Sequence, residues 1–146
     1  MQKLPHTYTV SVTGKPEEAL HAQAAHLPAL EVAPPAQFNG PGDKWSPEEL
    51  LMAAMANCLV LSFRAIASAS KLAWQSIEVS SEGELNNENG KIKFTAIRSK
   101  ATLTIDASYS QEKAEKLLKK AEQTCFVSNS LNCDSDLVCE IFVAHG

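Results

Sequence analysis

The chain has 146 residues, of which 45% are apolar and 21% charged, and its 17 acidic and 13 basic residues give a formal net charge of −4. This length and apolar content are typical of a single globular domain with an ordinary hydrophobic core. The acidic balance, with no basic cluster on any segment, argues against a nucleic-acid partner.

The first ten residues, MQKLPHTYTV, contain no apolar stretch of signal-peptide length, so we expect a cytoplasmic protein. In that reducing compartment, cysteines are more often free thiols, metal ligands or catalytic groups than structural disulfides. The chain has four cysteines, Cys58, Cys125, Cys133 and Cys139. They are therefore the first candidates for a chemical role.

Three short elements are predicted before residue 40. Residues 8–12, YTVSV, alternate like a half-buried strand and end at a Thr-Gly pair. Residues 16–25 have a composition that allows a short helix. Residues 27–35, LPALEVAPP, predict a second strand, which is stopped by its two final prolines because proline cannot donate to a sheet.

The strongest predicted element is a helix over residues 46–71. Ser46 is an N-cap serine, Pro47 occupies the first helical position, and Glu49 follows three residues after the cap. Together they form a capping box, in which the serine and glutamate side chains satisfy free backbone N–H groups at the start of a helix.

This helix would be about 37 Å long, which approaches the diameter of a domain of this size. Residues 50–69 are apolar on nearly every face and approach the length of a membrane span, but Asn57 and Arg64 within the run favour a core helix. A helix that is apolar all round must be covered all round. We therefore expect a homodimer in which two such helices pack together, and no membrane association.

The second half of the chain predicts an α+β arrangement. Residues 74–85 and 91–106 alternate around an Asn-Gly turn and form an antiparallel hairpin. Residues 110–124 form an amphipathic helix, and residues 137–143 form a last strand. Because no linker or repeat divides the chain, residues 1–146 are expected to be one α+β domain with a long central helix against antiparallel sheets.

The cysteines allow several interpretations. Cys58, in the middle of the long helix, is either a small buried hydrophobe or a reactive thiol, and the second role requires a stabilised thiolate with another thiol in reach. The stretch CFVSNSLNC, from Cys125 to Cys133, is compatible with a redox pair, a metal site or buried side chains. Its spacing matches no zinc template, and the four histidines show no paired ligand spacing, so we expect no metal. Cys139 is expected to face the core from the last strand.

Three motifs carry a resemblance to the OsmC/Ohr family of osmotically induced and organic-hydroperoxide-resistance proteins. The start of the long helix, with Cys58 ten positions after Glu48, resembles the family's N-P-E-E/Q-L…A-A…C signature. Cys125 and the residues after it resemble its second motif, C-P-V-S. The segment FNGPG at residues 38–42 is similar to its F-x-G-x-G approach to the helix.

The resemblance implies an intertwined α+β homodimer that reduces organic hydroperoxides by thiol chemistry at two interface sites. Cys58 would be the peroxidatic nucleophile and become a sulfenic acid, and Cys125 would be the resolving thiol that forms a disulfide with it. Cys133 remains an alternative resolving thiol. An external dithiol, lipoyl-type in this family, would restore both cysteines without a bound cofactor.

Glu48 is the third candidate site residue, since in the family it helps to hold an activating arginine. Ten residues of straight helix place Glu48 about 15 Å from Cys58, so a shared site requires Glu48 of the other subunit. Alternatively, Glu48 is a first-turn carboxylate favoured by the helix dipole. The chain lacks the family's N-terminal arginine, for which Lys15 or Lys44 is a candidate substitute.

Two hypotheses follow. The first is a thiol peroxidase that acts on organic hydroperoxides, since an apolar lining around Cys58 suits a hydrophobic peroxide better than hydrogen peroxide. The second is a non-enzymatic protein of the same fold that binds an apolar ligand at the dimer interface. The two differ in whether a group near Cys58 activates its thiol.

Overall fold

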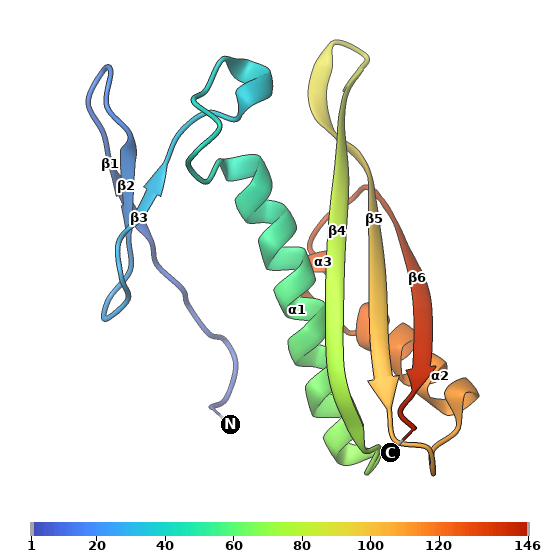
Figure 1. Ribbon diagram of the computed structural model, residues 1–146. Helices are drawn as coiled ribbons and strands as arrows, with labels where there is room; N and C mark the ends of the chain where they lie inside the picture. The colour runs from blue at the N-terminus through green and yellow to red at the C-terminus, as the bar shows by residue number, and fades with distance from the viewer. Residues whose placement is uncertain (1, 146) are drawn as a thin grey trace. The chain divides into compact units, whose positions relative to one another are not determined.

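The computed structural model describes residues 2–145 and divides the chain into two compact units, which meet after Leu51. The first unit contains a three-stranded antiparallel sheet of β1 (Ser11–Thr13), β2 (Leu20–Gln23) and β3 (Leu30–Val32), in the order β1-β2-β3. A 3-10 turn, η1 (Ala36–Phe38), follows the sheet (Figure 1). The two strands predicted from the sequence are found near their expected places.

The helix predicted over residues 16–25 is wrong, because this segment contains strand β2. Leu20 and Ala22 are half-buried and alternate with exposed neighbours, which is the period of a strand and not of a helix. Ala22 pairs with Val12 on one side and with Leu30 on the other. Backbone pairing on both sides decides the conformation of a segment whose side chains have a weak preference.

Helix α1 (Pro47–Ala69) begins at the predicted N-cap serine, with one of the two hydrogen bonds of a capping box and a side chain–side chain bond in place of the other. The N–H of Glu49 donates to Ser46 Oγ at 3.1 Å, and the Ser46 hydroxyl donates to the Glu49 carboxylate at 2.8 Å. The helix ends where Lys71 adopts a left-handed conformation with φ 56° and the N–H of Leu72 donates to the Ala67 carbonyl. Its bounds agree with the sequence prediction within two residues.

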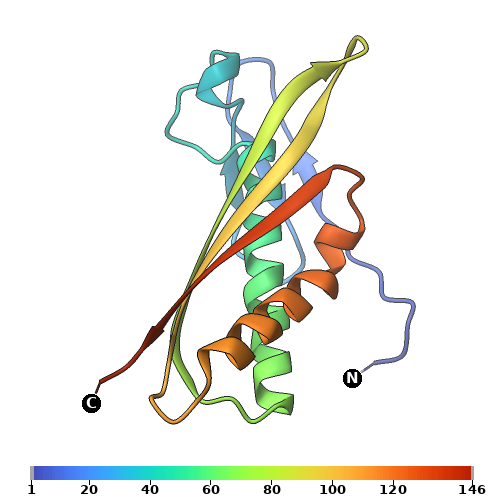
Figure 2. The ribbon, with the colours of Figure 1, turned by 90° about the vertical axis from the view of Figure 1, so that its right-hand side faces the viewer.

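The second unit contains a three-stranded sheet of β4 (Trp74–Glu88), β5 (Lys91–Ile105) and β6 (Asp134–Val143), in that order. Strands β4 and β5 form the predicted hairpin through Asn89 and Gly90, both with positive φ. Strand β6 runs parallel to β5, which requires a crossover, and helices α2 (Gln111–Gln123) and α3 (Phe126–Asn129) provide it (Figure 2).

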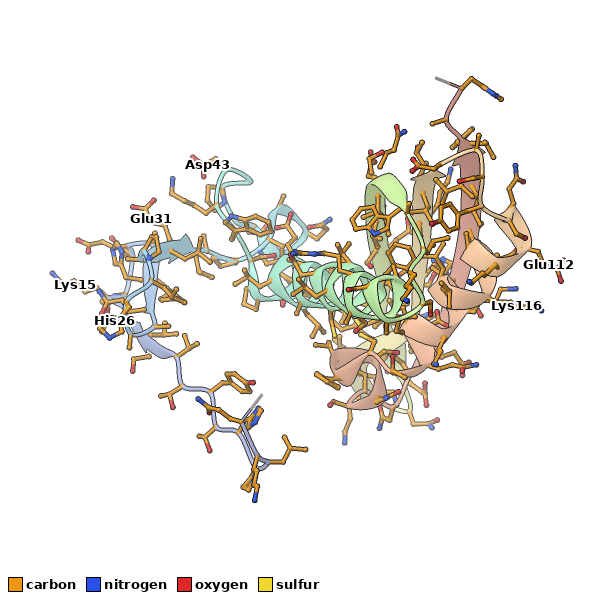
Figure 3. All side chains as sticks on the ribbon, turned by 90° about the horizontal axis from the view of Figure 1, so that it is seen from below. Lys15, His26, Glu31, Asp43, Glu112 and Lys116 are labelled. Carbon is orange, nitrogen blue, oxygen red and sulfur yellow. The ribbon has the colours of Figure 1, made fainter. Side chains whose placement is uncertain are left out.

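One face of this sheet packs against α1 and α2, which lie on the same side of it (Figure 2). The core of the second unit is formed by residues that are buried at the contact of these three elements: Leu59, Phe63 and Ala67 of α1, Ala101, Leu103 and Ile105 of β5, and Ala114, Leu118 and Ala121 of α2. The opposite side of α2 carries charged side chains, including Glu112 and Lys116, which pair at 3.5 Å and point to solvent (Figure 3). This arrangement confirms the α+β class.

By its length and composition, helix α1 could cross a membrane. The core helix of a soluble protein satisfies the same two criteria. Only 22% of its most apolar window is buried inside the chain, and Leu61 remains 57% exposed. Its buried residues, Met55, Leu59, Phe63 and Ala67, recur every four positions and so occupy one face. Within the second unit, these residues form the face of α1 that packs against the core.

Candidate functional site

Two of the four cysteines meet at the contact of α1 with the end of α2. Cys58 lies half-exposed at the border of the buried face of α1, and Cys125 is the N-cap of α3, with 2% of its surface exposed. The chain passes directly from α2 into α3 at Cys125, which aims the first N–H groups of α3 at Cys58. Both thiols are free.

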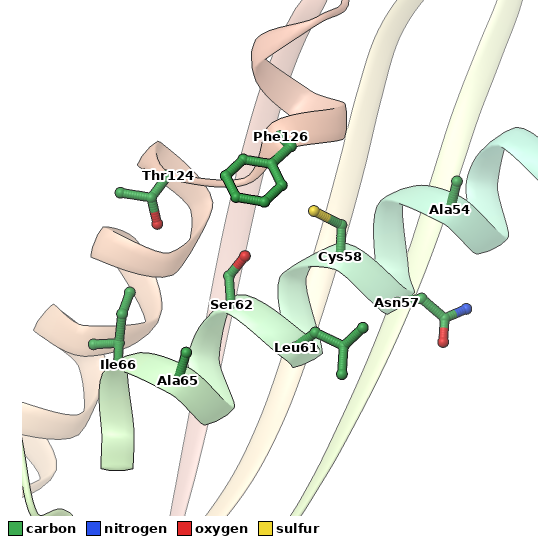
Figure 4. A pocket seen from close by; sticks show the side chains of 9 residues that line it. All are labelled: Ala54, Asn57, Cys58, Leu61, Ser62, Ala65, Ile66, Thr124 and Phe126. Carbon is green, nitrogen blue, oxygen red and sulfur yellow. The ribbon is translucent and has the colours of Figure 1, made fainter. Parts of the chain in front are cut away.

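An open, mostly apolar groove of about 510 Å³ gives access to Cys58. Its apolar side chains include Leu61 and Ile66 of α1 and Phe126 of α3, which is 80% exposed. Figure 4 shows the Cys58 sulfur and the Ser62 hydroxyl on the side of α1 that faces Phe126. The groove can therefore place an apolar molecule against the Cys58 sulfur.

The surroundings of Cys58 favour its thiolate. Partial burial raises the pKa of Cys58, but hydrogen bonds from the Cys125 thiol, the backbone N–H groups of Val127 and Phe126, and the Ser62 hydroxyl outweigh it and lower the pKa below its ordinary value. A thiolate, and not a thiol, is the nucleophilic form of cysteine. Cys58 is therefore the more reactive member of the pair.

The surroundings of Cys125 have the opposite effect. Burial is the largest cause that raises the pKa of Cys125, and its hydrogen bond to Cys58 raises the pKa further because the proton is needed for that bond. Two titratable groups whose pKa values are driven apart in this way are suited to different chemical roles. Of the two thiols, Cys58 is therefore the one that loses its proton more readily.

The model of the OsmC-like protein family matches residues 40–140 of this chain. The chain belongs to the OsmC-like family. The match includes Cys58 and Cys125 and runs from before α1 to Glu140, within β6. The resemblance noted in the sequence motifs is thereby confirmed.

Relatives of this OsmC-like protein agree with that assignment. YmaD, an uncharacterized protein of Bacillus subtilis, is 30% identical over 115 residues, which are 77% of each chain. An OsmC-like protein of unknown function from Vibrio cholerae has the same fold, with a TM-score of 0.86, 18% identity, and coverage of 93% of this chain and 100% of the other. The organic hydroperoxide resistance protein OsmC of Legionella pneumophila is 25% identical, with a TM-score of 0.76 and coverage of 96% and 99%.

The other two cysteines of the OsmC-like chain lie away from the groove lining. Cys133 is half-buried in the loop before β6. Cys139 packs from β6 against the core, as predicted from the alternation of the strand, and burial is the largest cause that raises its pKa. Within residues 2–145, no group of three or more His, Cys, Asp or Glu side chains is arranged to hold a metal ion.

Glu48, the third predicted site residue, lies in the first turn of α1, and the ten helical residues up to Cys58 separate the two by about 15 Å. Its Oε1 atom is buried and accepts no hydrogen bond from the part of the chain that the structure describes. A buried carboxylate oxygen is expected to have a partner. Of the two lysines considered as substitutes for an arginine, Lys44 pairs with Glu31 at 3.5 Å, and Lys15 is exposed (Figure 3).

Sequence reasoning did not identify Ser62 or the N–H groups after Cys125 as parts of the site. Ser62 follows Cys58 by four residues, and this spacing places two side chains on the same face of a helix. That spacing was a usable signal. The donation by Phe126 and Val127 depends on the short helix α3, which no periodic pattern in four residues could indicate.

Proposed function

We propose that this OsmC-like protein is a thiol peroxidase that reduces organic hydroperoxides to alcohols. The Cys58 thiolate attacks the terminal peroxide oxygen, the O–O bond breaks, and the leaving alkoxide takes up a proton to become the alcohol. Cys58 is then a sulfenic acid. The Cys125 thiol condenses with it, forming an S–S bond and releasing water.

The observation that carries this proposal is a pair of facing thiols beside an open groove, whose surroundings shift their pKa values in opposite directions. The hydrogen bonds at Cys58 favour a nucleophilic thiolate. The raised pKa of Cys125 favours its thiol form, and the proton of that thiol becomes part of the water released when the disulfide forms. The Legionella relative is named as an organic hydroperoxide resistance protein, and the family thus includes proteins with that name.

The substrate class follows from the groove lining. Leu61, Ile66 and Phe126 offer apolar surface, and Asn57 and Thr124 are its polar members beside Ser62. Burying an alkyl or aryl group contributes about 25 cal/mol per Å² of apolar area, a gain that hydrogen peroxide cannot obtain. We therefore expect a hydroperoxide with a sizeable apolar part. The resemblance to the OsmC/Ohr family implies an external lipoyl-type dithiol as the reductant of the disulfide.

The proposal includes a cytoplasmic homodimer in which the whole chain acts as one domain. Apolar side chains of the first unit are exposed, among them Tyr8, Val10 and Val12, and α1 is largely uncovered. A second copy would cover such surfaces, since large exposed apolar areas are unusual on monomers. The buried Oε1 of Glu48 would then belong to the site of the other subunit.

The test follows the loss of cumene hydroperoxide in the presence of the reduced protein and dihydrolipoamide. We expect turnover by the wild-type protein, none by Cys58→Ser, and unchanged turnover by Cys139→Ser, which removes a core-facing thiol outside the groove. Peroxide loss that is equal in Cys58→Ser and the wild type would contradict the proposal.

The apolar groove also favours a second candidate, a non-enzymatic protein that binds an apolar ligand. This function requires no electron transfer. It predicts that a fluorescent fatty acid binds equally to wild-type protein and Cys58→Ser, while neither consumes peroxide. Binding without any loss of peroxide in the wild type would favour it over the peroxidase.

A further inference from the structure

The chain contains two arginines, and neither is placed to stabilise a thiolate at Cys58. Arg98 projects from β5 and donates to Glu82 at 3.0 Å and to Glu84 at 3.3 Å. Arg64 is exposed on α1, six residues and about 240° around the helix from Cys58. No charged side chain lines the groove within residues 2–145. Within the described residues of one chain, the groups beside Cys58 that can stabilise its thiolate are neutral hydrogen-bond donors.

We propose that neutral donors take the place of a cation at this site, and that the Ser62 hydroxyl and the backbone N–H of Phe126 act together with the Cys125 thiol and the Val127 N–H to hold Cys58 in its reactive, anionic form. The inference concerns the same site as the proposed peroxidase and rests on it for its catalytic meaning. It assigns a role to two groups of this chain that lie outside the cysteine pair.

Ser62 is placed for this role by the helix itself. It lies one turn beyond Cys58 on α1, and its hydroxyl points toward the same side of the groove (Figure 4). Its hydroxyl donates a hydrogen bond to the Cys58 sulfur, which lowers the pKa of Cys58. A hydrogen bond that is made to the charged form of an acid favours that form.

Phe126 contributes through its backbone. It is the first helical residue of α3, so its N–H has no carbonyl partner within that helix and is free to donate to the Cys58 sulfur. The motif that this segment resembles has proline at the same position, and proline has no N–H. Phenylalanine here therefore adds a donor that the proline form of the motif lacks.

If neutral donors stabilise the Cys58 thiolate, the pKa of Cys58 should depend less on salt concentration than it would beside a cation. The attraction between an exposed cation and a thiolate weakens as ionic strength rises, whereas a short hydrogen bond to a neutral group is hardly screened. Cys125 is the titratable group that faces Cys58, and its pKa is raised, so it stays protonated while Cys58 ionises. The lower pH midpoint of thiol reactivity therefore belongs to Cys58.

The experiment measures the rate of Cys58 alkylation by iodoacetamide against pH. Trypsin cleaves after Lys44 and Arg64, and the resulting peptide contains Cys58 as its single cysteine. The alkylation of Cys58 is therefore measured from the mass of this peptide. We expect Ser62→Ala and Phe126→Pro each to raise the midpoint and to slow alkylation at neutral pH about three- to tenfold, with the same plateau rate at high pH.

Two matched controls isolate the donors. Phe126→Ala removes the ring but keeps the N–H, and Ser68→Ala makes the same change as Ser62→Ala at an exposed position of the same helix. Proline fits position 126, because it is tolerated at the first helical residue and Cys125 already has the extended conformation, with φ −67° and ψ 117°, that proline requires before it. Ser62→Thr keeps the hydroxyl and should retain the wild-type midpoint.

The proposal is overturned if the midpoint of Ser62→Ala equals that of Ser68→Ala, or if that of Phe126→Pro equals that of Phe126→Ala. A wild-type midpoint that rises with added salt would also overturn it, since a cation would then be the stabilising group. Alkylation needs no peroxide. A chain that does not turn over hydroperoxide can therefore still confirm the neutral donors, and the failures of the two proposals are distinguishable.

Discussion

At the scale of single residues, the chemistry depends on which thiol reacts with the Cys58 sulfenic acid. Cys125 faces Cys58 and hydrogen-bonds to it, whereas Cys133 lies eight residues further along, beyond α3. A disulfide requires the two Cα atoms to be within about 7 Å of each other. Because Cys125 is the thiol in contact with Cys58, it is the expected partner.

This pairing predicts a specific cross-link after one equivalent of cumene hydroperoxide. Trypsin releases residues 45–64 with Cys58 and residues 121–146 with the other three cysteines. We expect the joined mass of these peptides in the wild type and in Cys133→Ser, and its loss in Cys125→Ser, all measured by mass spectrometry without reduction. The reverse pattern in the two variants would identify Cys133 as the resolving thiol.

The sequence motifs selected Cys58 and Cys125 as candidate site residues, and the structure brings the two thiols together. The sequence could not show what surrounds them. The pKa of Cys58 depends on Phe126 and Val127, which are 68 and 69 positions away along the chain, and such contacts appear only when α2 is folded against α1. Glu48 was selected by the same motif, and its role in the site stays a prediction.

At the scale of secondary structure elements, α1 must start at a fixed residue for Cys58 to face the groove. The Ser46 side chain is fully buried, accepts a hydrogen bond from the Glu49 N–H and donates one to the Glu49 carboxylate. Its loss leaves the N–H of Glu49 without that acceptor. The helix start is thus fixed by side-chain chemistry that a sequence can display.

Ser46→Ala is therefore expected to lower the free energy of unfolding by about 1 kcal/mol, measured from the midpoint of urea denaturation. Ser110→Ala is the matched control at the other long helix, where Ser110 Oγ accepts only from Lys113 N, at 3.2 Å, and is exposed. We expect a smaller loss there. A loss at Ser46 no greater than that at Ser110 would contradict a stabilising role for the reciprocal bond.

Elements with strong local signals were predicted well. The capping box, the Asn89-Gly90 turn and the apolar stripe of α2 each specify their structure within a few residues. Strand β2 and helix α3 were not predicted. Strand β2 is stabilised by its pairing with β1 and β3, which its own side chains do not indicate. Helix α3 has only four residues, too few to show a helical pattern in the sequence.

At the scale of the whole molecule, we propose a dimer because α1 is an apolar helix with a small buried share and because the buried Glu48 Oε1 has no hydrogen-bond partner within residues 2–145. We expect light scattering to give twice the 15.8 kDa mass of one chain. A mass of one chain at micromolar concentration would exclude the dimer. In a monomer, Glu48 could not contact Cys58, because the two residues are about 15 Å apart on one helix.

If each site takes Cys58 from one subunit and Glu48 from the other, then two inactive variants should complement each other. Glu48→Gln and Cys58→Ser, each inactive alone, form mixed dimers when refolded together. One of the two sites in each mixed dimer would combine an intact Cys58 with an intact Glu48. Random pairing should restore about a quarter of the wild-type hydroperoxide turnover. If the two residues acted within one chain, no mixture would contain an intact site, and the activity would stay at the level of the separate variants.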